Sequence, residues 1–338
     1  MRKTALLIIF VATLFSVVAC QAEVREAGGG DQGDGGGQNG PIRLAVVPQA
    51  VGFEYWTFLR EGAECAVSEH EEVSMQWDGV TQQTDVNGQV NLLQNFITQG
   101  VDGLVYSPSD ARVLADVSQQ ALDQGLTVVN VDTRTDPQPE EAPVFATDNV
   151  AAARQVPDLL AEELGPDGGK IAFLPFQPGS STNDARTRGF KEALEDHPEL
   201  ELVAEQSSQN DFTTALRVTE DILTANPDLD AIFAANESST VGAAEAVQQA
   251  GKAGDIVIVG WDVSPDLLQG IRDGVISAIV VQNPFKMGYD GVDAAVRIIR
   301  EGASVESEDT GSTIVTRENL SDPEVQAVLN PSCEDPPD

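Results

Sequence analysis

The sequence predicts an α/β protein with two doubly wound parallel sheets, one in each of two lobes. From residue 42 onward, short β-branched runs alternate with helical stretches of ten to sixteen residues. This alternation is typical of parallel sheets that are covered by helices on both faces. Ten such strands suit two sheets better than one. A segment of the chain is also repeated, which favours two similar halves.

The expected strands are apolar, β-branched runs, most of them followed by polar or glycine-containing turns. They span residues 42–47, 73–77, 103–106, 127–131, 144–147, 171–174, 201–205, 231–235, 256–260 and 277–281. The expected helices are amphipathic stretches between these strands. They lie near residues 56–69, 84–99, 110–124, 149–164, 184–196, 213–225, 239–250, 265–273 and 285–301.

The repeat relates residues 102–132 to residues 230–262. Each copy has an aspartate, a strand, a polar turn, a helix, a glycine break, a second strand and a closing aspartate. Asp132 and Asp262 therefore occupy equivalent places at the carboxyl ends of two strands, where open α/β sheets bind their ligands.

Polar and aromatic side chains follow many of the predicted strands. Four aromatic residues fall within six positions at the turn into the first helix; we expect Phe58 to pack in the core and the aromatic pair before it to face a cleft. Any one polar residue at a strand end could simply cap a helix. The set is more specific, because a parallel fold brings these ends together. The candidate ligand-binding residues are Tyr55, Trp56, Asp132, Thr147, Arg186, Phe212, Asn236, Trp261, Asp262 and Gln282.

Carboxylates, amides, a guanidinium and flat aromatic rings together suit a small uncharged polyol. Carboxylates and amides can bind adjacent hydroxyl groups, and aromatic faces can cover the apolar side of a sugar ring. We expect no cofactor and no metal site.

With these residues in hand, the chain resembles the periplasmic sugar-binding proteins of the ribose-binding type, which are receptors of ABC importers. The resemblance covers about residues 42–318 and rests on ordered motifs: GVDGLVYSPSD, VFATDNV, the Arg-x-x-Gly-Phe of 186–190, AIFAANE, VIVGWD and the glutamine of VVQNP. It implies a type I periplasmic binding fold, with two lobes joined by a three-strand hinge. Lobe one would comprise residues 42–147 plus 283–311, and lobe two residues 148–282 plus 312–330.

The resemblance also implies a role for each matching residue. The residues that would stack on the sugar ring are Tyr55, Trp56 and Phe212, and those that would bind its hydroxyl groups are Asp132, Asn236 and Asp262. Arg186 would act from lobe two. Trp261 would pair with Asp262, and Gln282 would lie beside the hinge. A ligand that touches both lobes would stabilise the closed form. An ABC permease would recognise that form, and we expect the receptor itself to be a monomer.

Two positions depart from the family pattern. The ribose and galactose receptors have arginine directly after the first aspartate, whereas this chain has Thr133 there and Arg134 one position later. Phe53 replaces a polar asparagine in the first loop. These departures weaken an assignment to ribose itself, and the identity of the sugar or polyol stays open.

The first forty residues predict export. Arg2 and Lys3 precede an apolar run of fifteen residues that is too short to span a membrane and fits a signal peptide over residues 1–19. The run ends in Val-Val-Ala-Cys, which resembles a bacterial lipoprotein signal and implies lipidation of Cys20; an ordinary secretory signal is the alternative. Residues 20–41 are glycine-rich and predict a flexible tether. The protein would then be held at a membrane surface, in the periplasm or on the outer face of the cell membrane.

The remaining cysteines, Cys65 and Cys333, form an even pair in an exported chain, and either a disulfide or two free thiols fits the sequence. Residues 331–338 would form a short tail. The formal net charge of −36 argues against binding to nucleic acid or to anionic lipid surfaces. The same acidity fits either a well-solvated surface or a salt-rich habitat.

Three other functions compete with sugar uptake. An enzyme is disfavoured, because the chain has no phosphate-binding loop and only two histidines, His70 and His197, in acidic helical surroundings. A sugar-responsive transcription factor is excluded by the export signal and by the lack of a basic DNA-binding segment. The third alternative, a module that reports a sugar or a furanose-like signal to a chemoreceptor or sensor kinase, is not separated from uptake by the sequence.

Overall fold

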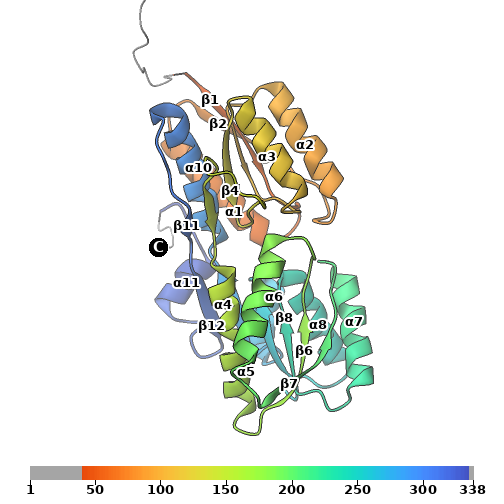
Figure 1. The fold of residues 1–338 in the computed structure, drawn as a ribbon. Coiled ribbons are helices and arrows are strands. Elements are labelled where there is room, and N and C mark those ends of the chain that lie inside the picture. The colour runs from red at the N-terminus through yellow and green to blue at the C-terminus, as the bar shows by residue number, and fades with distance from the viewer. Residues whose placement is uncertain (1–39, 335–338) are drawn as a thin grey trace, which may run out of the picture. The chain divides into compact units, whose positions relative to one another are not determined.

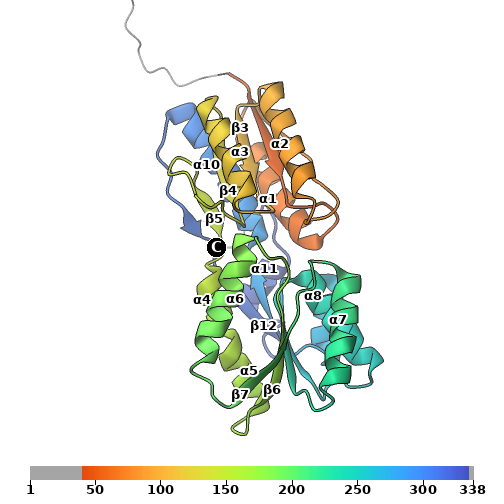
Figure 2. The same ribbon diagram turned by 45° about the vertical axis from the view of Figure 1, so that its right-hand side comes forward.

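A computed structural model describes residues 40–334, which form two α/β lobes, each built around a six-stranded sheet (Figures 1 and 2). The two-lobed α/β architecture expected from the sequence is therefore confirmed. The signal peptide, Cys20 and nearly all of the expected tether lie outside the described residues.

Lobe one holds the first sheet, whose strand order is β11-β5-β4-β3-β1-β2. All its pairings are parallel. The strands are β1 (Ile42–Val47), β2 (Val73–Trp77), β3 (Gly103–Tyr106), β4 (Thr127–Val131), β5 (Val144–Ala146) and β11 (Glu308–Asp309). The helices of this lobe are α1 (Glu54–Glu69), α2 (Val86–Gln99), α3 (Val113–Asp123) and α10 (Pro284–Glu301).

Lobe two holds the second sheet, in the order β12-β10-β9-β8-β6-β7. Its strands are β6 (Gly169–Leu174), β7 (Leu200–Glu205), β8 (Ala231–Ala234), β9 (Val257–Trp261), β10 (Ala278–Gln282) and β12 (Ser312–Thr316). Its helices are α4 (Asn149–Arg154), α5 (Val156–Leu164), α6 (Ser181–Leu194), α7 (Phe212–Ala225), α8 (Glu237–Gln249), α9 (Pro265–Asp273) and α11 (Pro323–Leu329).

Apolar strand residues form the cores on both faces of each sheet. In lobe one, Val105 and Val129 pack with α1 and α10 on one face, while Leu104 and Val128 pack with α2 and α3 on the other. Lobe two is divided in the same way by its sheet. Both faces are covered, as a parallel sheet requires, so the ends of the strands are left as the natural place for a ligand.

The chain passes between the two sheets three times: after β5, after β10 and between β11 and β12. The segments involved are close to residues 147–148, 283 and 310–311. Thr147 Oγ1 donates a hydrogen bond to the carbonyl of Gly311, over 3.0 Å, and so joins two of these crossings.

The structure differs from the expected elements in three places. One expected helix over residues 149–164 is two helices, α4 and α5, which break at Gln155 because Pro157 cannot donate the backbone hydrogen bond that a continuous helix needs. The second sheet is not wholly parallel, since β12 pairs antiparallel with β10. Strands β11 and β12 and helix α11 were not expected, because they are short and lack a long periodic pattern.

Cys65 and Cys333 form a disulfide, with their Cα atoms 5.6 Å apart. Cys65 lies on α1 of lobe one. Cys333 follows α11, whose Val325 and Leu329 pack in a core of lobe two. The disulfide therefore adds a covalent link between the lobes. Within residues 40–334, no helix is long and apolar enough to cross a membrane.

Candidate functional site

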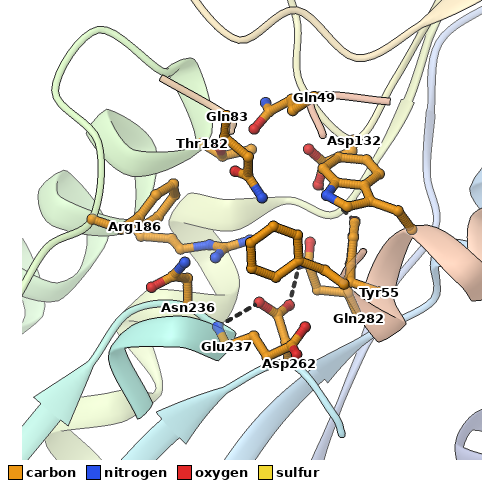
Figure 3. Close-up of a pocket in the computed structure, with 13 residues that line it drawn as sticks. Gln49, Tyr55, Gln83, Asp132, Thr182, Arg186, Asn236, Glu237, Asp262 and Gln282 are labelled. Atoms are coloured by element: carbon orange, nitrogen blue, oxygen red, sulfur yellow. Dashed lines mark hydrogen bonds between the residues drawn. The ribbon is translucent and has the colours of Figure 1, made fainter. Parts of the chain in front are cut away.

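A small pocket lies between the lobes. Lobe one contributes residues from its first two loops and from the end of β4. Lobe two contributes residues from α6, α8 and the end of β9, and Gln282 lies at the start of a crossing segment. The lining residues are Gln49, Phe53, Tyr55, Trp56, Gln83, Asp132, Phe176, Thr182, Arg186, Asn236, Glu237, Asp262 and Gln282 (Figure 3).

Asp132 is fixed on the lobe-one side by three hydroxyl groups. Tyr55 Oη donates to its Oδ1 over 2.6 Å, while Ser107 Oγ and Thr133 Oγ1 donate to its Oδ2 over 3.1 and 2.6 Å. Gln49 Nε2 in turn donates to Thr133 Oγ1 over 2.8 Å. Thr133 therefore helps to orient Asp132.

Asp262 has two different donors on the lobe-two side. Gln282 Nε2 donates to its Oδ1 over 2.7 Å, and the backbone N–H of Glu237 donates to its Oδ2 over 3.0 Å. Glu237 is the first residue of α8, so its free N–H is one of the unpaired donors at a helix N-terminus. Burial raises the pKa of Asp262, and the nearby charge of Arg186 partly opposes that rise.

Arg186 enters from α6 and points toward the middle of the pocket (Figure 3). Its Nε donates to Asn149 Oδ1 over 2.8 Å and its Nη1 to the carbonyl of Ala235 over 2.7 Å. The guanidinium lies 4.2 Å from the ring centre of Trp261 and 5.3 Å from that of Phe176. Burial lowers its pKa, while the charges of nearby acids raise it. These contacts fix the side chain without pairing it directly to a carboxylate.

Two further pKa shifts describe the charge state of the pocket. Burial, with the charge of Asp132 next, raises the pKa of Tyr55 well above its ordinary value of 10, so the phenol stays protonated and donates. Burial, and then the charge of Asp262, raises the pKa of Glu237 to about 8. A backbone N–H of Tyr55, across the cleft, lowers it in part.

Three lining residues have buried polar atoms without a hydrogen-bond partner: Trp56 Nε1, Glu237 Oε2 and Gln282 Oε1. Buried polar atoms are nearly always satisfied in native proteins, and leaving one unpaired costs roughly 1–3 kcal/mol. One donor and two acceptors therefore await partners in the same small pocket.

The lobes touch around this pocket, so the structure is a closed form. Gln177 Nε2 donates to the carbonyl of Ser109 over 2.8 Å, and the N–H of Ala111 donates to the carbonyl of Gly179 over 3.1 Å. Phe58 of α1 packs, partly buried, against a core of lobe two.

Seven of the ten residues predicted from the sequence line the pocket: Tyr55, Trp56, Asp132, Arg186, Asn236, Asp262 and Gln282. The side chain of Asn236 is already engaged, since its Oδ1 accepts from Ser239 N and its Nδ2 donates to Asn210 Oδ1. Asn236 therefore caps α8. Its position at a strand end allowed two roles, capping a helix or binding a ligand hydroxyl group, and capping is the simpler one.

The other three predicted residues are not brought into this pocket. Trp261 is fully buried behind Arg186 and packs beside Phe233. Thr147 lines a wider, adjoining groove near the crossings, which shares Asp132 and Thr182 with the pocket. Phe212 is 42% exposed and lines a third groove.

Sequence reasoning did not select six of the lining residues: Gln49, Phe53, Gln83, Phe176, Thr182 and Glu237. Gln49 and Phe176 follow strands β1 and β6 within three residues, so the rule used for the other strand ends would have found them. Glu237 adjoins the selected Asn236. Gln83 lies in a loop that no periodic pattern marks. Within residues 40–334, no group of His, Cys, Asp and Glu is arranged to hold a metal ion.

Comparison with known proteins assigns the fold to a family. A model described as a periplasmic binding protein domain matches residues 44–303. This chain belongs to that family. The D-ribose/D-allose-binding protein of Pseudomonas aeruginosa is 31% identical over 275 residues, which cover 80% of this chain and 85% of that protein.

Solved structures of the same fold agree with this assignment. An ABC transporter solute-binding protein from Agrobacterium vitis with bound D-fucose has a TM-score of 0.81 and 31% identity, and covers 85% of this chain and 99% of its own. A carbohydrate transporter solute-binding protein from Agrobacterium radiobacter in complex with D-arabinose has a TM-score of 0.82 and 27% identity, and covers 87% and 100%. The resemblance inferred from the sequence is confirmed, and these relatives are named as binding proteins rather than enzymes, as expected.

Proposed function

We propose that this periplasmic binding protein is an exported, lipid-anchored receptor that binds one small sugar or polyol between its lobes and delivers it to an ABC importer. The observation that carries the proposal is the set of unpaired buried atoms in the pocket, Trp56 Nε1, Glu237 Oε2 and Gln282 Oε1. Adjacent hydroxyl groups, each both donor and acceptor, can satisfy donors and acceptors together.

The rest of the pocket supports the same ligand class. Asp132 and Asp262 approach from opposite lobes, and Tyr55 and Trp56 supply rings 4.8 Å apart, centre to centre, at an angle of 89°. Relatives that are solute-binding proteins of ABC transporters support uptake in preference to sensing.

A thermal-shift screen tests the ligand class. The panel is D-ribose, D-allose, D-arabinose, D-fucose and myo-inositol, with amino acids as the contrasting set. A sugar present at 100 times its dissociation constant should stabilise the native state by ~2.7 kcal/mol. A shift from amino acids, with none from any sugar or polyol, would refute the proposal.

Anchoring is tested separately. A single acyl chain gives marginal membrane binding, so stable attachment requires more than one hydrophobic signal. We expect the mature protein to carry lipid on Cys20, visible as added mass on the N-terminal fragment, and to partition with membranes. Cys20→Ser should release it; a membrane-bound Cys20→Ser protein would contradict the anchor.

A further inference from the structure

One corner of the pocket presents hydrogen-bond acceptors without matching donors. It is formed by the side chains of Asp262, Glu237 and Gln282. Because Gln282 Nε2 donates to Asp262 Oδ1, its Oε1 is the atom left without a partner. Glu237 contacts the other oxygen of Asp262 through its backbone N–H, and its own Oε2 is buried without a partner. Gln282 is only 2% exposed, so its open acceptor is not a surface feature.

The lining of the pocket also has more carboxyl groups than cationic groups. Its ionisable side chains include three carboxyl groups, on Asp132, Asp262 and Glu237, against the single guanidinium of Arg186. Arg186 donates to an amide and a backbone carbonyl rather than to any of the three acids.

We infer that the sugar or polyol bound by this receptor carries a protonated amino group, which is held in the corner formed by Asp262, Glu237 and Gln282. An ammonium group has three N–H donors and no acceptor, which matches Gln282 Oε1 and the two carboxylates of the corner once Glu237 has lost its proton. A hydroxyl group brings one donor and leaves part of the corner unsatisfied. This inference rests on the proposed function, because it names the substrate class of the same pocket.

The electrostatics of Glu237 agree with this assignment. Four groups act on its carboxyl from the elements around it: Asp262 at the end of β9, Glu54 and the N–H of Tyr55 on α1, and Asp266 on α9. Burial raises its pKa most, the three acids raise it further, and only the N–H lowers it. An empty corner of this kind retains a proton on Glu237, whereas a bound ammonium would replace that proton and pair with the carboxylate.

The alternative is a neutral ligand. A protonated Glu237 could donate to a hydroxyl group, and the corner would then need no cation. Glutamine has the shape of protonated glutamic acid and also donates, so Glu237→Gln separates the two cases. With a neutral ligand the variant should bind as well as the native protein. With an ammonium ligand it loses the charge that holds the amine.

The experiment measures dissociation constants at pH 7 by calorimetry for matched pairs. The pairs are D-glucosamine, D-galactosamine, D-mannosamine, 3-amino-3-deoxy-D-glucose and 6-amino-6-deoxy-D-glucose against their parent hexoses, and amino-deoxy-inositol against myo-inositol. We expect at least one amino compound to bind ten-fold or more tightly than its parent. Glu237→Gln should reduce that ratio to about one, while Glu54→Gln, which removes a nearby charge outside the pocket lining, should leave it close to the native value.

Other outcomes overturn the inference in distinguishable ways. If neutral sugars bind and no amino compound is preferred, the amine assignment fails and the proposed function stands. If an amino preference survives Glu237→Gln, the corner is not its source. If no member of the panel binds, the inference fails; the proposed function fails with it only if D-ribose, D-allose, D-arabinose and D-fucose also give no thermal shift.

Discussion

Asp132 and Asp262 share an uncommon backbone conformation. Their φ angles are +63° and +70°, in the left-handed region that asparagine and aspartate tolerate better than most residues do. The two residues end equivalent strands in the two lobes, and each accepts hydrogen bonds from side chains or backbone of its own lobe. The same local strain is thus used twice to turn a carboxylate into the cleft.

Substitution of Asp262 should separate binding from stability. Asp262→Asn keeps a residue that tolerates positive φ and removes a charged acceptor, which should weaken binding of the receptor's best sugar by about 2–3 kcal/mol, or roughly 30- to 160-fold. Asp262→Ala should weaken binding similarly. It should also lower the unfolding free energy by ~1 kcal/mol, because the left-handed backbone conformation costs alanine more free energy than it costs aspartate. Calorimetry and denaturant unfolding measure the two effects. Native affinity in Asp262→Asn would remove this carboxylate from the site.

At the residue scale, the sequence predicted positions better than roles. The repeat placed Asp132 and Asp262 at matching strand ends, because strand and helix lengths fix where a parallel sheet ends. The repeat could not predict that Trp261 lies behind Arg186, because that position depends on how these two side chains pack against each other within lobe two. Asn236 was indistinguishable from a cap by sequence, and it does cap α8.

At the scale of elements, α1 and α10 approach each other through two glycines. A Cβ added at Gly62 would overlap the carbonyl of Phe285, and one added at Gly288 would overlap the carbonyl of Leu59. A backbone carbonyl cannot move away from an added Cβ by changing rotamer, as a flexible side chain can, so the two helices would have to shift. Because α1 carries Tyr55 and Trp56, this close packing also sets where the aromatic pair enters the pocket.

Gly288→Ala should therefore destabilise the protein, although alanine is the better helix former. Overpacking typically costs ~1–3 kcal/mol, and the gain in helix propensity offsets up to ~1 kcal/mol of it. We expect a net loss of about 1–2 kcal/mol in denaturant unfolding. Gly40→Ala, where the added Cβ meets nothing within 4 Å, serves as the control. Equal stability of the two variants would show that the helices can separate without cost.

Elements with strong patterns were predictable, and their exceptions have local causes. Strands 42–47, 73–77, 103–106 and 127–131 have the bounds expected, because each is a short stretch of apolar or alternating residues closed by turn residues. The break at Gln155 comes from one proline. Strand β12 runs antiparallel to β10 because the chain returns beside β10 after the last crossing. The residue pattern of one strand does not predict whether its neighbour is parallel or antiparallel.

At the scale of the whole molecule, the Cys65–Cys333 disulfide closes a loop of 268 residues and joins the lobes in addition to the three crossings. A cross-link of this kind restricts the unfolded chain, and native disulfides typically contribute ~2–4 kcal/mol. Cys65→Ala/Cys333→Ala should lower the unfolding free energy by about that amount. A reducing agent should lower the stability of the native protein and leave the variant unchanged. No difference between the two proteins under oxidising conditions would contradict a stabilising role.

Closure of the empty receptor should depend on pH through Glu237. In the closed structure burial raises its pKa to about 8, while in an open form the carboxyl would face water and return toward its ordinary pKa. Between these two pKa values the closed form binds a proton that the open form lacks, so closure is favoured at low pH and loses that advantage as pH rises to about 8. Small-angle scattering of the ligand-free protein from pH 6 to 9 should therefore show a radius of gyration that increases with pH. Glu237→Gln should show little change, and an equal increase in both proteins would assign the opening to other groups.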